Sequence, residues 1–266
     1  MALRPRDQQD LYALAEYYDI AFDFRDLDKE CDALDALSVR HRGAKPASFV
    51  DIACGPGYHC IQYALRGRVC HALDLNPVMI EYAKRKADRA GAEVQFQVAD
   101  MRDFLLPKPV DLAFCGISTI HYMLTDDDLV KHLRAVARNL TPGGIYVFEA
   151  NHPRDQFGVG SSTKNEWESK RGDITVRMSW GLDDLNFDPI TQISESTVRI
   201  AVDRDGRTET HQFTNVDRTY TYHEFVLLIE KSGVFEICEW LGALDPNVAL
   251  DNSKASWRMI PVLRKR

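Results

Sequence analysis

The sequence predicts an α/β fold: a doubly wound, seven-stranded and mostly parallel sheet that carries an antiparallel, β-rich lid insertion. Two observations predict it. Between residues 48 and 150, five apolar runs alternate with segments that have the hydrophobic period of a helix, which is typical of a parallel sheet. From 153 to 220 the alternation gives way to strands with period-two patterning, and after 220 it resumes.

The five apolar runs each read as one strand of the parallel sheet. They are "SFVDIA", "RVCHALD", "VQFQVAD", "VDLAFC" and "GIYVFEA". The helices between them carry end signals: Asn76-Pro77 opens a helix that ends at Gly91, and Thr125 with Asp128 opens another. A helical segment precedes the first strand.

In the insertion, "DITVRMSW" and "STVRIAV" each place their apolar residues on one face, and the second run leads into an Asp205-Gly206 turn. A capping box at Thr221 then opens a helix that ends at Gly233, and "VFEICEWL" and "SWRMIPVLR" complete the sheet. We therefore divide the chain into residues 1–152 (N-terminal helical segment and ligand-binding half), 153–220 (lid) and 221–266 (C-terminal completion). No linker separates them, so we expect the lid to pack over the ligand edge of the sheet.

The composition is that of an ordinary globular chain, with 45% hydrophobic residues among 266. No window approaches the ~18 consecutive apolar residues of a membrane span. Charges at Arg4, Arg6, Asp7 and Asp10 occupy the place where a signal peptide has its apolar core. These features predict a soluble, cytoplasmic protein with no membrane partner.

The charge balance and the cysteines exclude further classes. A net charge of −7, from 33 basic and 40 acidic residues, opposes binding to a phosphate backbone, so we expect no nucleic-acid partner. The six cysteines have no metal-ligand spacing and several lie within apolar runs. We therefore expect buried thiols, and neither a metal site nor a disulfide framework.

The stretch "FVDIACGPGYHC" sets small residues at alternate positions directly after the first strand: Ala53, Gly55 and Gly57. Such a turn lets the backbone approach a ligand at the N-terminus of the following helix. A dinucleotide fingerprint would need a third glycine where Cys60 stands, which disfavours a nicotinamide-dependent reductase, and no Walker-type lysine follows. The pattern here is instead D-x-A-x-G-x-G, which begins at Asp51.

With the motifs that follow in order, this turn resembles that of the class I S-adenosylmethionine-dependent methyltransferases, over about residues 11 to 150. The resemblance implies a Rossmann-like methyltransferase fold with S-adenosyl-L-methionine as cofactor. In that family the turn cradles the methionine half of the cofactor, at positions matched by Asp51, Ala53, Gly55 and Gly57. Ala53 departs from the commonest first glycine.

Three further motifs carry the resemblance. "HALDLNP" places Asp74 where the family has the acid that accepts both ribose hydroxyls, with Leu75 beside it. "VADMRDF" places Asp100 to receive the adenine amino group and Met101 to pack on the ring, and "FCGISTIHYM" brings Cys115 to the cofactor. Alone, Asp74 could be a helix-capping acid and Asp51 could bond backbone N–H groups of the turn.

The N-terminal "EYYDIAF" resembles the segment whose aromatic residue closes over the cofactor carboxylate in small-molecule members of the family. Tyr18 matches that residue, and a place in the helix core is the equal alternative. The chain has "CGIS" where methyltransferases of nucleic-acid bases or glutamine have Asn/Asp-Pro-Pro-Tyr. The resemblance therefore favours a small-molecule acceptor, like those of glycine and amino-sugar N-methyltransferases.

We expect methyl transfer to a small molecule, with nitrogen preferred over oxygen as the acceptor atom. The alternatives are an O-methyltransferase and a non-catalytic S-adenosylmethionine-binding protein. His121, just past the fourth strand, is the candidate general base, with simple packing as the equal alternative. Candidate acceptor contacts are assigned by region to Tyr122, Asn151, His152, Trp180 and Tyr220.

Overall fold

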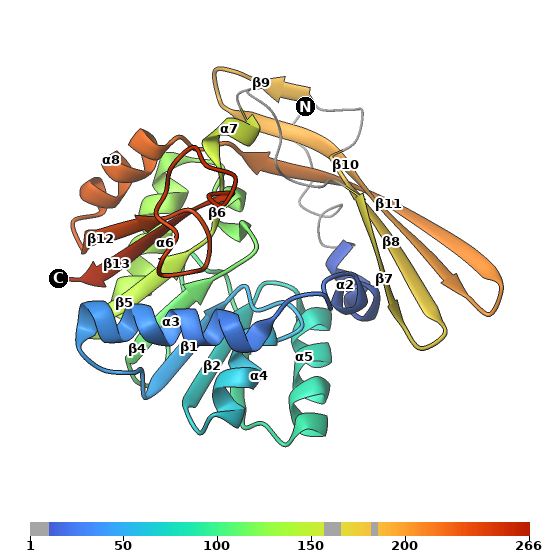
Figure 1. Ribbon diagram of the computed structural model, residues 1–266, viewed down its shortest axis with the longest axis horizontal. Helices are drawn as coiled ribbons and strands as arrows, with labels where there is room; N and C mark the ends of the chain where they lie inside the picture. The colour runs from blue at the N-terminus through green and yellow to red at the C-terminus, as the bar shows by residue number, and fades with distance from the viewer. Residues whose placement is uncertain (1–10, 157–165, 182–185) are drawn as a thin grey trace.

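The computed structural model describes residues 11–156, 166–181 and 186–266 (Figure 1). The described helices are α2 (Ala15–Ala21), α3 (Leu27–Arg42), α4 (Tyr58–Leu65), α5 (Pro77–Ala90), the 3-10 helix η1 (Thr119–Tyr122), α6 (Asp126–Arg138), α7 (Pro153–Gln156) and α8 (Tyr222–Ser232). The described strands are β1 (Ser48–Ile52), β2 (Val69–Asp74), β3 (Val94–Val98), β4 (Val110–Cys115), β5 (Leu140–Phe148), β6 (Ala150–Asn151), β7 (Glu166–Arg171), β8 (Ile174–Trp180), β9 (Asn186–Asp188), β10 (Ile193–Arg204), β11 (Arg207–Arg218), β12 (Phe235–Leu241) and β13 (Arg258–Lys265).

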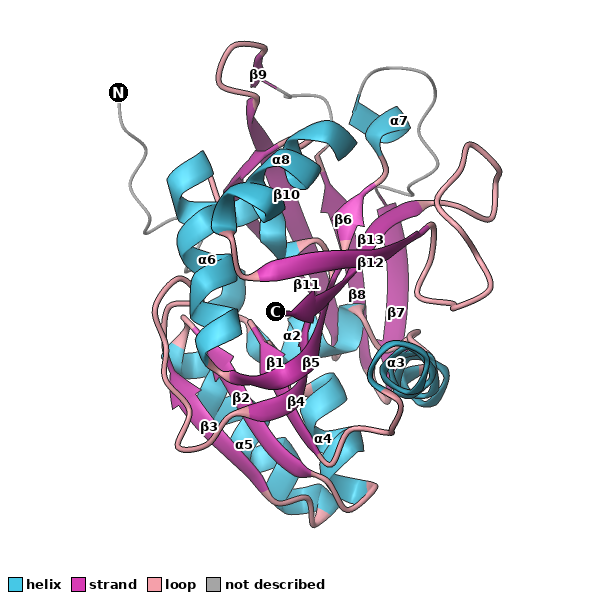
Figure 2. Ribbon diagram, turned by 90° about the vertical axis from the view of Figure 1, so that its left-hand side faces the viewer, coloured by secondary structure: helices cyan, strands magenta, loops and turns pink. Residues whose placement is uncertain are grey.

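The central sheet has the strand order β12-β13-β5-β4-β1-β2-β3, and the short β6 pairs with β13. Strands β1 to β5 are parallel, whereas β13 runs antiparallel to both of its neighbours. Helices α6 and α8 pack on one face and α3 and α4 on the other (Figure 2). This arrangement confirms the predicted doubly wound sheet, including its reversed last strand.

Local signals set the helix ends. Asn76 accepts the N–H groups of Val78 and Met79 to open α5, which ends at Gly91 in the left-handed conformation (φ 68°). Thr221 and Glu224 form a complete capping box on α8. These predicted caps are confirmed, and they fix the loops that follow β2 and β11.

A second, antiparallel sheet of order β11-β10-β8-β7, with β9 paired to β10, stands beside the central sheet (Figure 1). Asp205 and Gly206, both with positive φ, form the turn of the β10–β11 hairpin, as predicted. The hydrophobic pattern does not predict β7 or β11, because polar residues dominate their sequences. These two strands form because β7 pairs with β8 and β11 pairs with β10, and not because of their own hydrophobic pattern.

Helix α2 joins the second sheet to the first. The inward residues of β8 and β10 are buried against it. Asp19 of α2 is 1% exposed; its carboxylate lies 2.6 Å from the ammonium of Lys86 on α5 and 2.7 Å from the guanidinium of Arg171 on β7. A buried carboxylate with two cations resists separation of these elements, so α2 holds the second sheet in place over the carboxyl ends of the parallel strands.

All six cysteines are free thiols, and five of them are buried. Within the three described stretches of chain, no helix has both the length and the hydrophobicity to cross a membrane.

Candidate active site

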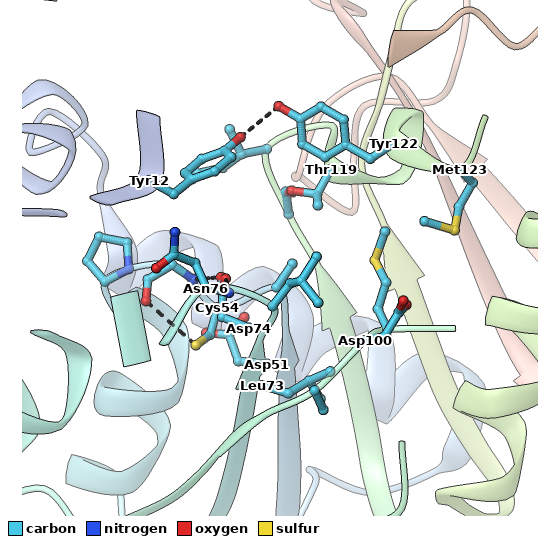
Figure 3. A pocket seen from close by; sticks show the side chains of 18 of the residues that line it. Tyr12, Asp51, Cys54, Leu73, Asp74, Asn76, Asp100, Thr119, Tyr122 and Met123 are labelled. Carbon is cyan, nitrogen blue, oxygen red and sulfur yellow. Dashed lines mark hydrogen bonds between the residues drawn. The ribbon is translucent and has the colours of Figure 1, made fainter. Parts of the chain in front are cut away.

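A cavity of about 660 Å³ opens at the carboxyl ends of β1, β2 and β4, where ligands bind in open α/β sheets. Its size lies within the ~300–1,000 Å³ typical of small-molecule sites. We call its sheet side the floor (Ala53–Gly55, Asp74, Asp100) and its opposite side the roof (Tyr12, Tyr122, Ile193, Val216). Figure 3 shows the two tyrosines on one side of the cavity and the floor carboxylates on the other.

The glycine turn forms part of the floor, and its two glycines have different structural roles. A Cβ added at Gly55 (φ 53°) would meet no atom within 4 Å, so this position opens into the cavity. A Cβ at Gly57 would lie 3.3 Å from Ala83, Cys60 and Ile61, outside the cavity lining. Gly55 thus leaves room for a ligand, whereas Gly57 allows the start of α4 to pack closely on α5.

Asp74 is anchored at the end of β2. Its two carboxylate oxygens accept backbone N–H groups from Gly55 and Asn76, each at 2.9 Å. Burial raises the pKa of this carboxyl, and these N–H donors oppose the rise. Leu75 is a third backbone donor to this carboxylate. Three donors leave part of its lone-pair capacity for a hydroxyl, so the turn-bonding and ligand-binding interpretations of Asp74 are compatible.

Asp51, at 3% exposure, accepts the N–H of Cys60 at 3.1 Å, and burial raises its pKa to about 6 despite the nearby His59. Beside it lies Arg25, a cation that lines the cavity. The Arg25 guanidinium is 2.5 Å from Glu30 and 4.0 Å from Glu149, and these carboxylates raise its pKa although burial opposes the rise. A buried cation at this end of the floor suits an anionic ligand group.

Asp100 and Arg102 close the other end of the floor. Arg102 donates to both carboxylate oxygens of Asp100, at 2.6 to 3.1 Å, and pairs with Asp128 of α6 at 2.9 Å. This guanidinium holds the pKa of Asp100 below its usual value. Met101 and Leu75 add apolar surface next to Asp100, as a flat ring would need.

The loop after β4 brings residues to the roof through a strained turn. Ile117 (φ 52°) and Ser118 (φ 54°) are both left-handed, which is unfavourable for a β-branched residue. Glu149 accepts the N–H of Ile117 at 2.5 Å, and Asn151 accepts the hydroxyl of Ser118 at 2.8 Å. These bonds hold the turn, from which Tyr122 reaches the cavity.

The roof centres on two phenols that meet from distant segments. The hydroxyl oxygens of Tyr12 and Tyr122 are 2.6 Å apart, and Tyr122 also donates to the Asn215 amide oxygen at 3.0 Å (Figure 3). Burial raises the pKa of both phenols, so both are neutral near pH 7. The roof therefore presents uncharged hydrogen-bonding oxygens to the cavity.

His121 lies outside the cavity lining. Its Nδ1 is 2.6 Å from the carbonyl oxygen of Arg218, and its Nε2 accepts the N–H of Asn151 at 3.0 Å. Burial lowers the pKa of the imidazole to about 4. With both nitrogens engaged, this geometry favours the packing alternative over proton abstraction.

Other residues that the sequence assigns to the site also lie elsewhere. Cys115 is fully buried within β4, and Trp180 packs within the second sheet. His152 bonds the carbonyl of Asp251 at 2.9 Å, and Tyr220 bonds the carbonyl of Met123. Position near a strand end brings a residue to the right region but does not decide which way its side chain points. Of the assigned residues, the cavity is lined by Tyr18, Asp51, Ala53, Gly55, Asp74, Leu75, Asp100, Met101 and Tyr122.

Sequence reasoning missed Tyr12, Arg25 and Asn215. Arg25 was detectable as the one arginine in the aromatic and acidic stretch "YYDIAFDFRDLDKE". Tyr12 and Asn215 gave no comparable signal, because their role depends on a meeting of segments more than 90 residues apart in the chain.

Residues 49–144 match the family model described as "Methyltransferase domain". Residues 49–144 therefore resemble a methyltransferase domain. This domain includes the glycine turn, Asp74 and Asp100, so the predicted resemblance is confirmed for the floor and the strands that support it.

The chain as a whole also has structural counterparts. A solved S-adenosylmethionine-dependent methyltransferase from Clostridium acetobutylicum superposes with a TM-score of 0.77 at 18% identity, covering 96% of this chain and 98% of that one. An amino pentose methyltransferase from Micromonospora echinaspora gives 0.69 at 17% identity, covering 100% and 98%. At such identities the likeness shows the fold, which here includes the second sheet.

In sequence, the chain is similar to the dTDP-4-amino-2,3,4,6-tetradeoxy-D-glucose N,N-dimethyltransferase of Saccharopolyspora spinosa. The two are 35% identical over 150 residues, which cover 56% of this chain and 59% of the relative.

Proposed function

We propose that this protein transfers a methyl group from S-adenosylmethionine to the nitrogen of a small-molecule amine, and that the amine belongs to an amino sugar. One observation carries the proposal: a single cavity has a glycine turn and fixed carboxylates on its floor and a pair of neutral phenols on its roof. The methyltransferase domain supports the donor, and the amino-sugar relative supports the acceptor.

The floor fits the donor group by group. Asp74 would hold the ribose hydroxyls with the lone pairs that its backbone donors leave, and Arg25 would pair with the amino-acid carboxylate. Asp100 and Met101 would hold the adenine, and the space at Gly55 would admit the chain between these parts. When bound, the cofactor supplies an electrophilic methyl group on sulfur.

The protein's own part in the reaction is to position the acceptor. An amine attacks in line through its nitrogen lone pair, so its N–H bonds must point away from the methyl group. Phenol oxygens at Tyr12 and Tyr122 would accept those N–H bonds from the side opposite the floor. Because both phenols stay neutral, they orient the nitrogen and do not remove its proton. The proton is lost to water, from an amine whose pKa lies near the pH of the reaction.

A labelled-methyl assay tests the proposal. The acceptors are dTDP-4-amino-2,3,4,6-tetradeoxy-D-glucose, its 4-hydroxy counterpart, glycine and a simple phenol, with S-adenosylhomocysteine measured in parallel. We expect label on the amino sugar and none on its hydroxy counterpart. Transfer to the hydroxy sugar or the phenol would identify an O-methyltransferase, and cofactor binding without any turnover would identify a non-catalytic protein.

A further inference from the structure

The inward face of the β10–β11 ribbon changes character along its length. Away from the cavity it is apolar and buried, with Val198, Ile200 and Val202 packed towards α2. Where the ribbon reaches the roof, the same face becomes polar although it stays covered. Ser194, Ser196 and Asn215 are 8%, 7% and 2% exposed, and Asp217 pairs across the ribbon with Ser194. Polar residues at covered strand positions lose hydration, so they stand out from ordinary core.

Asp217 is a half-buried carboxylate that pairs with no cation among the residues the structure describes. The Asn215 amide nitrogen donates to it at 3.0 Å, and the Ser194 side chain supports it as well. Arg218, the next residue, points to the other face and pairs with Asp126 and Glu224. Burial raises the pKa of Asp217 to about 6, so the group is mostly ionised at neutral pH. Its negative charge adds to the effect of burial in raising the pKa values of Tyr12 and Tyr122.

An ionised Asp217 fixes the direction of every hydrogen bond that leads to the cavity. It accepts only, so the amide NH₂ of Asn215 faces it and the amide oxygen faces Tyr122. Tyr122 must then donate its proton to Asn215, and the remaining proton between the phenols belongs to Tyr12. With both protons used inside the network, the phenol oxygens offer lone pairs to the cavity.

We propose that Asp217, acting through Asn215, is a positioning residue that sets the roof phenols as hydrogen-bond acceptors and so selects substrates that present N–H donors. The inference rests on the proposed function for its substrate class. Asp217 is too far along the network to take a proton directly, because the intervening carboxamide of Asn215 does not relay protons at neutral pH. Its influence is orientation and negative potential, both of which favour an ammonium or amine at the roof.

Loss of the charge removes this constraint. A neutral Asp217 can donate, Asn215 can turn its amide over, and Tyr122 can then donate into the cavity. A donor at the roof opposes an amine N–H.

The test compares Asp217→Asn, Asn215→Ala and their double variant with the wild type. A matched control, Asp203→Asn, removes a carboxylate from the exposed end of the same ribbon. With dTDP-4-amino-2,3,4,6-tetradeoxy-D-glucose as acceptor, we expect each single variant to lose about tenfold in kcat/KM, the double variant to lose no more, and the control to lose nothing. S-adenosylhomocysteine affinity should stay unchanged, and the melting temperature of Asp217→Asn should not fall, because a neutral amide avoids the desolvation that raises the pKa of this carboxyl.

A second readout needs no turnover. In protein labelled at the tyrosine ζ-carbon, the Tyr122 resonance, assigned with Tyr122→Phe, should shift as the pH passes about 6 in the wild type and stay fixed in Asp217→Asn. A wild type that methylates no amine would remove the proposed function, and this resonance would still decide the network. Full activity in Asp217→Asn, additive losses in the double variant, or an unshifted resonance would overturn the inference.

Discussion

The floor and the roof of the cavity are formed by different parts of the chain. The floor uses the glycine turn after β1 and carboxylates at or near the ends of β2 and β3, and Asp74 is held by N–H groups within 20 residues of it. The roof uses side chains from the segment before α2, from η1 and from β11. Tyr122 bonds Tyr12, 110 residues away in the chain, and Asn215, 93 residues away. The floor is therefore formed by residues close in sequence at the strand ends, whereas the roof is assembled by contacts between distant segments.

The difference separates two tasks. A floor that belongs to the strand ends keeps its shape as long as the sheet is folded, and this suits a ligand that never changes. A roof assembled from side chains outside the parallel strands, two of them on the β10–β11 ribbon, can change without disturbing the strand ends, which suits a variable acceptor. Variants at the two ends should therefore fail in different ways. Three variants at these ends and one outside the cavity, at His121, test this.

The largest effect should come from Gly55→Val on the floor. The added side chain projects into the cavity from a left-handed residue, so we expect S-adenosylmethionine affinity to fall ~100-fold or more, about 2.7 kcal/mol. Gly67→Val is the matched control: it also has positive φ and an open Cβ position, but lies outside the cavity. Both variants should lose about 1–3 kcal/mol of stability from strain. Calorimetry that finds equal cofactor affinities in the two would contradict the role given to Gly55.

The next effect should come from Tyr122→Phe on the roof. Loss of a hydroxyl that bonds the acceptor should cost ~1.5–3 kcal/mol, or about ten- to hundredfold in kcat/KM for the acceptor, with cofactor affinity unchanged. Tyr82→Phe serves as control, because its hydroxyl also bonds a neighbour, the Asp19 carboxylate, outside the cavity. If Tyr122→Phe lost cofactor binding instead, the two ends would not be separable.

His121→Asn should change stability more than catalysis. Asn is too short to keep both bonds of the imidazole, so we expect a loss of about 1–3 kcal/mol and less than a tenfold fall in kcat. The buried imidazole has a pKa of about 4 against 6.5 in the unfolded chain, so the unfolded state takes up the proton first and the wild type loses stability as pH falls from 6.5 towards 4. Denaturant unfolding across that range should show this loss reduced in the variant. A 10²–10⁴-fold fall in kcat with intact cofactor affinity would instead restore His121 as a general base.

Ala53→Gly should have the smallest effect. Ala53 holds a left-handed conformation (φ 53°) that glycine adopts without strain, but glycine also gives the unfolded chain more freedom. The two contributions oppose each other, so stability should change by less than about 1 kcal/mol and cofactor affinity by less than about twofold. A large change in affinity would mean that the alanine methyl group itself shapes the floor.

The same contrast explains what the sequence could predict. The parallel strands, the helix caps at Asn76 and Thr221, and the floor carboxylates follow from periodicity and from motifs within a few residues. Strands β7 and β11 could not be predicted, because their polar sequences carry no hydrophobic period and they form by pairing with β8 and β10. Asn215 and Asp217 escaped with them, since a polar residue in an unpredicted strand has no assigned face.

His121 has a consequence for how such a protein can diversify. One imidazole bonds Asn151, just before the 153–220 excursion begins, and Arg218, just before it ends. The chain therefore leaves and rejoins the sheet at nearly the same point, and an excursion closed at its base can be lengthened or shortened at its far end without moving the strand ends. Over generations, descendants of this gene could acquire new acceptors by rewriting one closed excursion while inheriting the glycine turn and Asp74 unchanged.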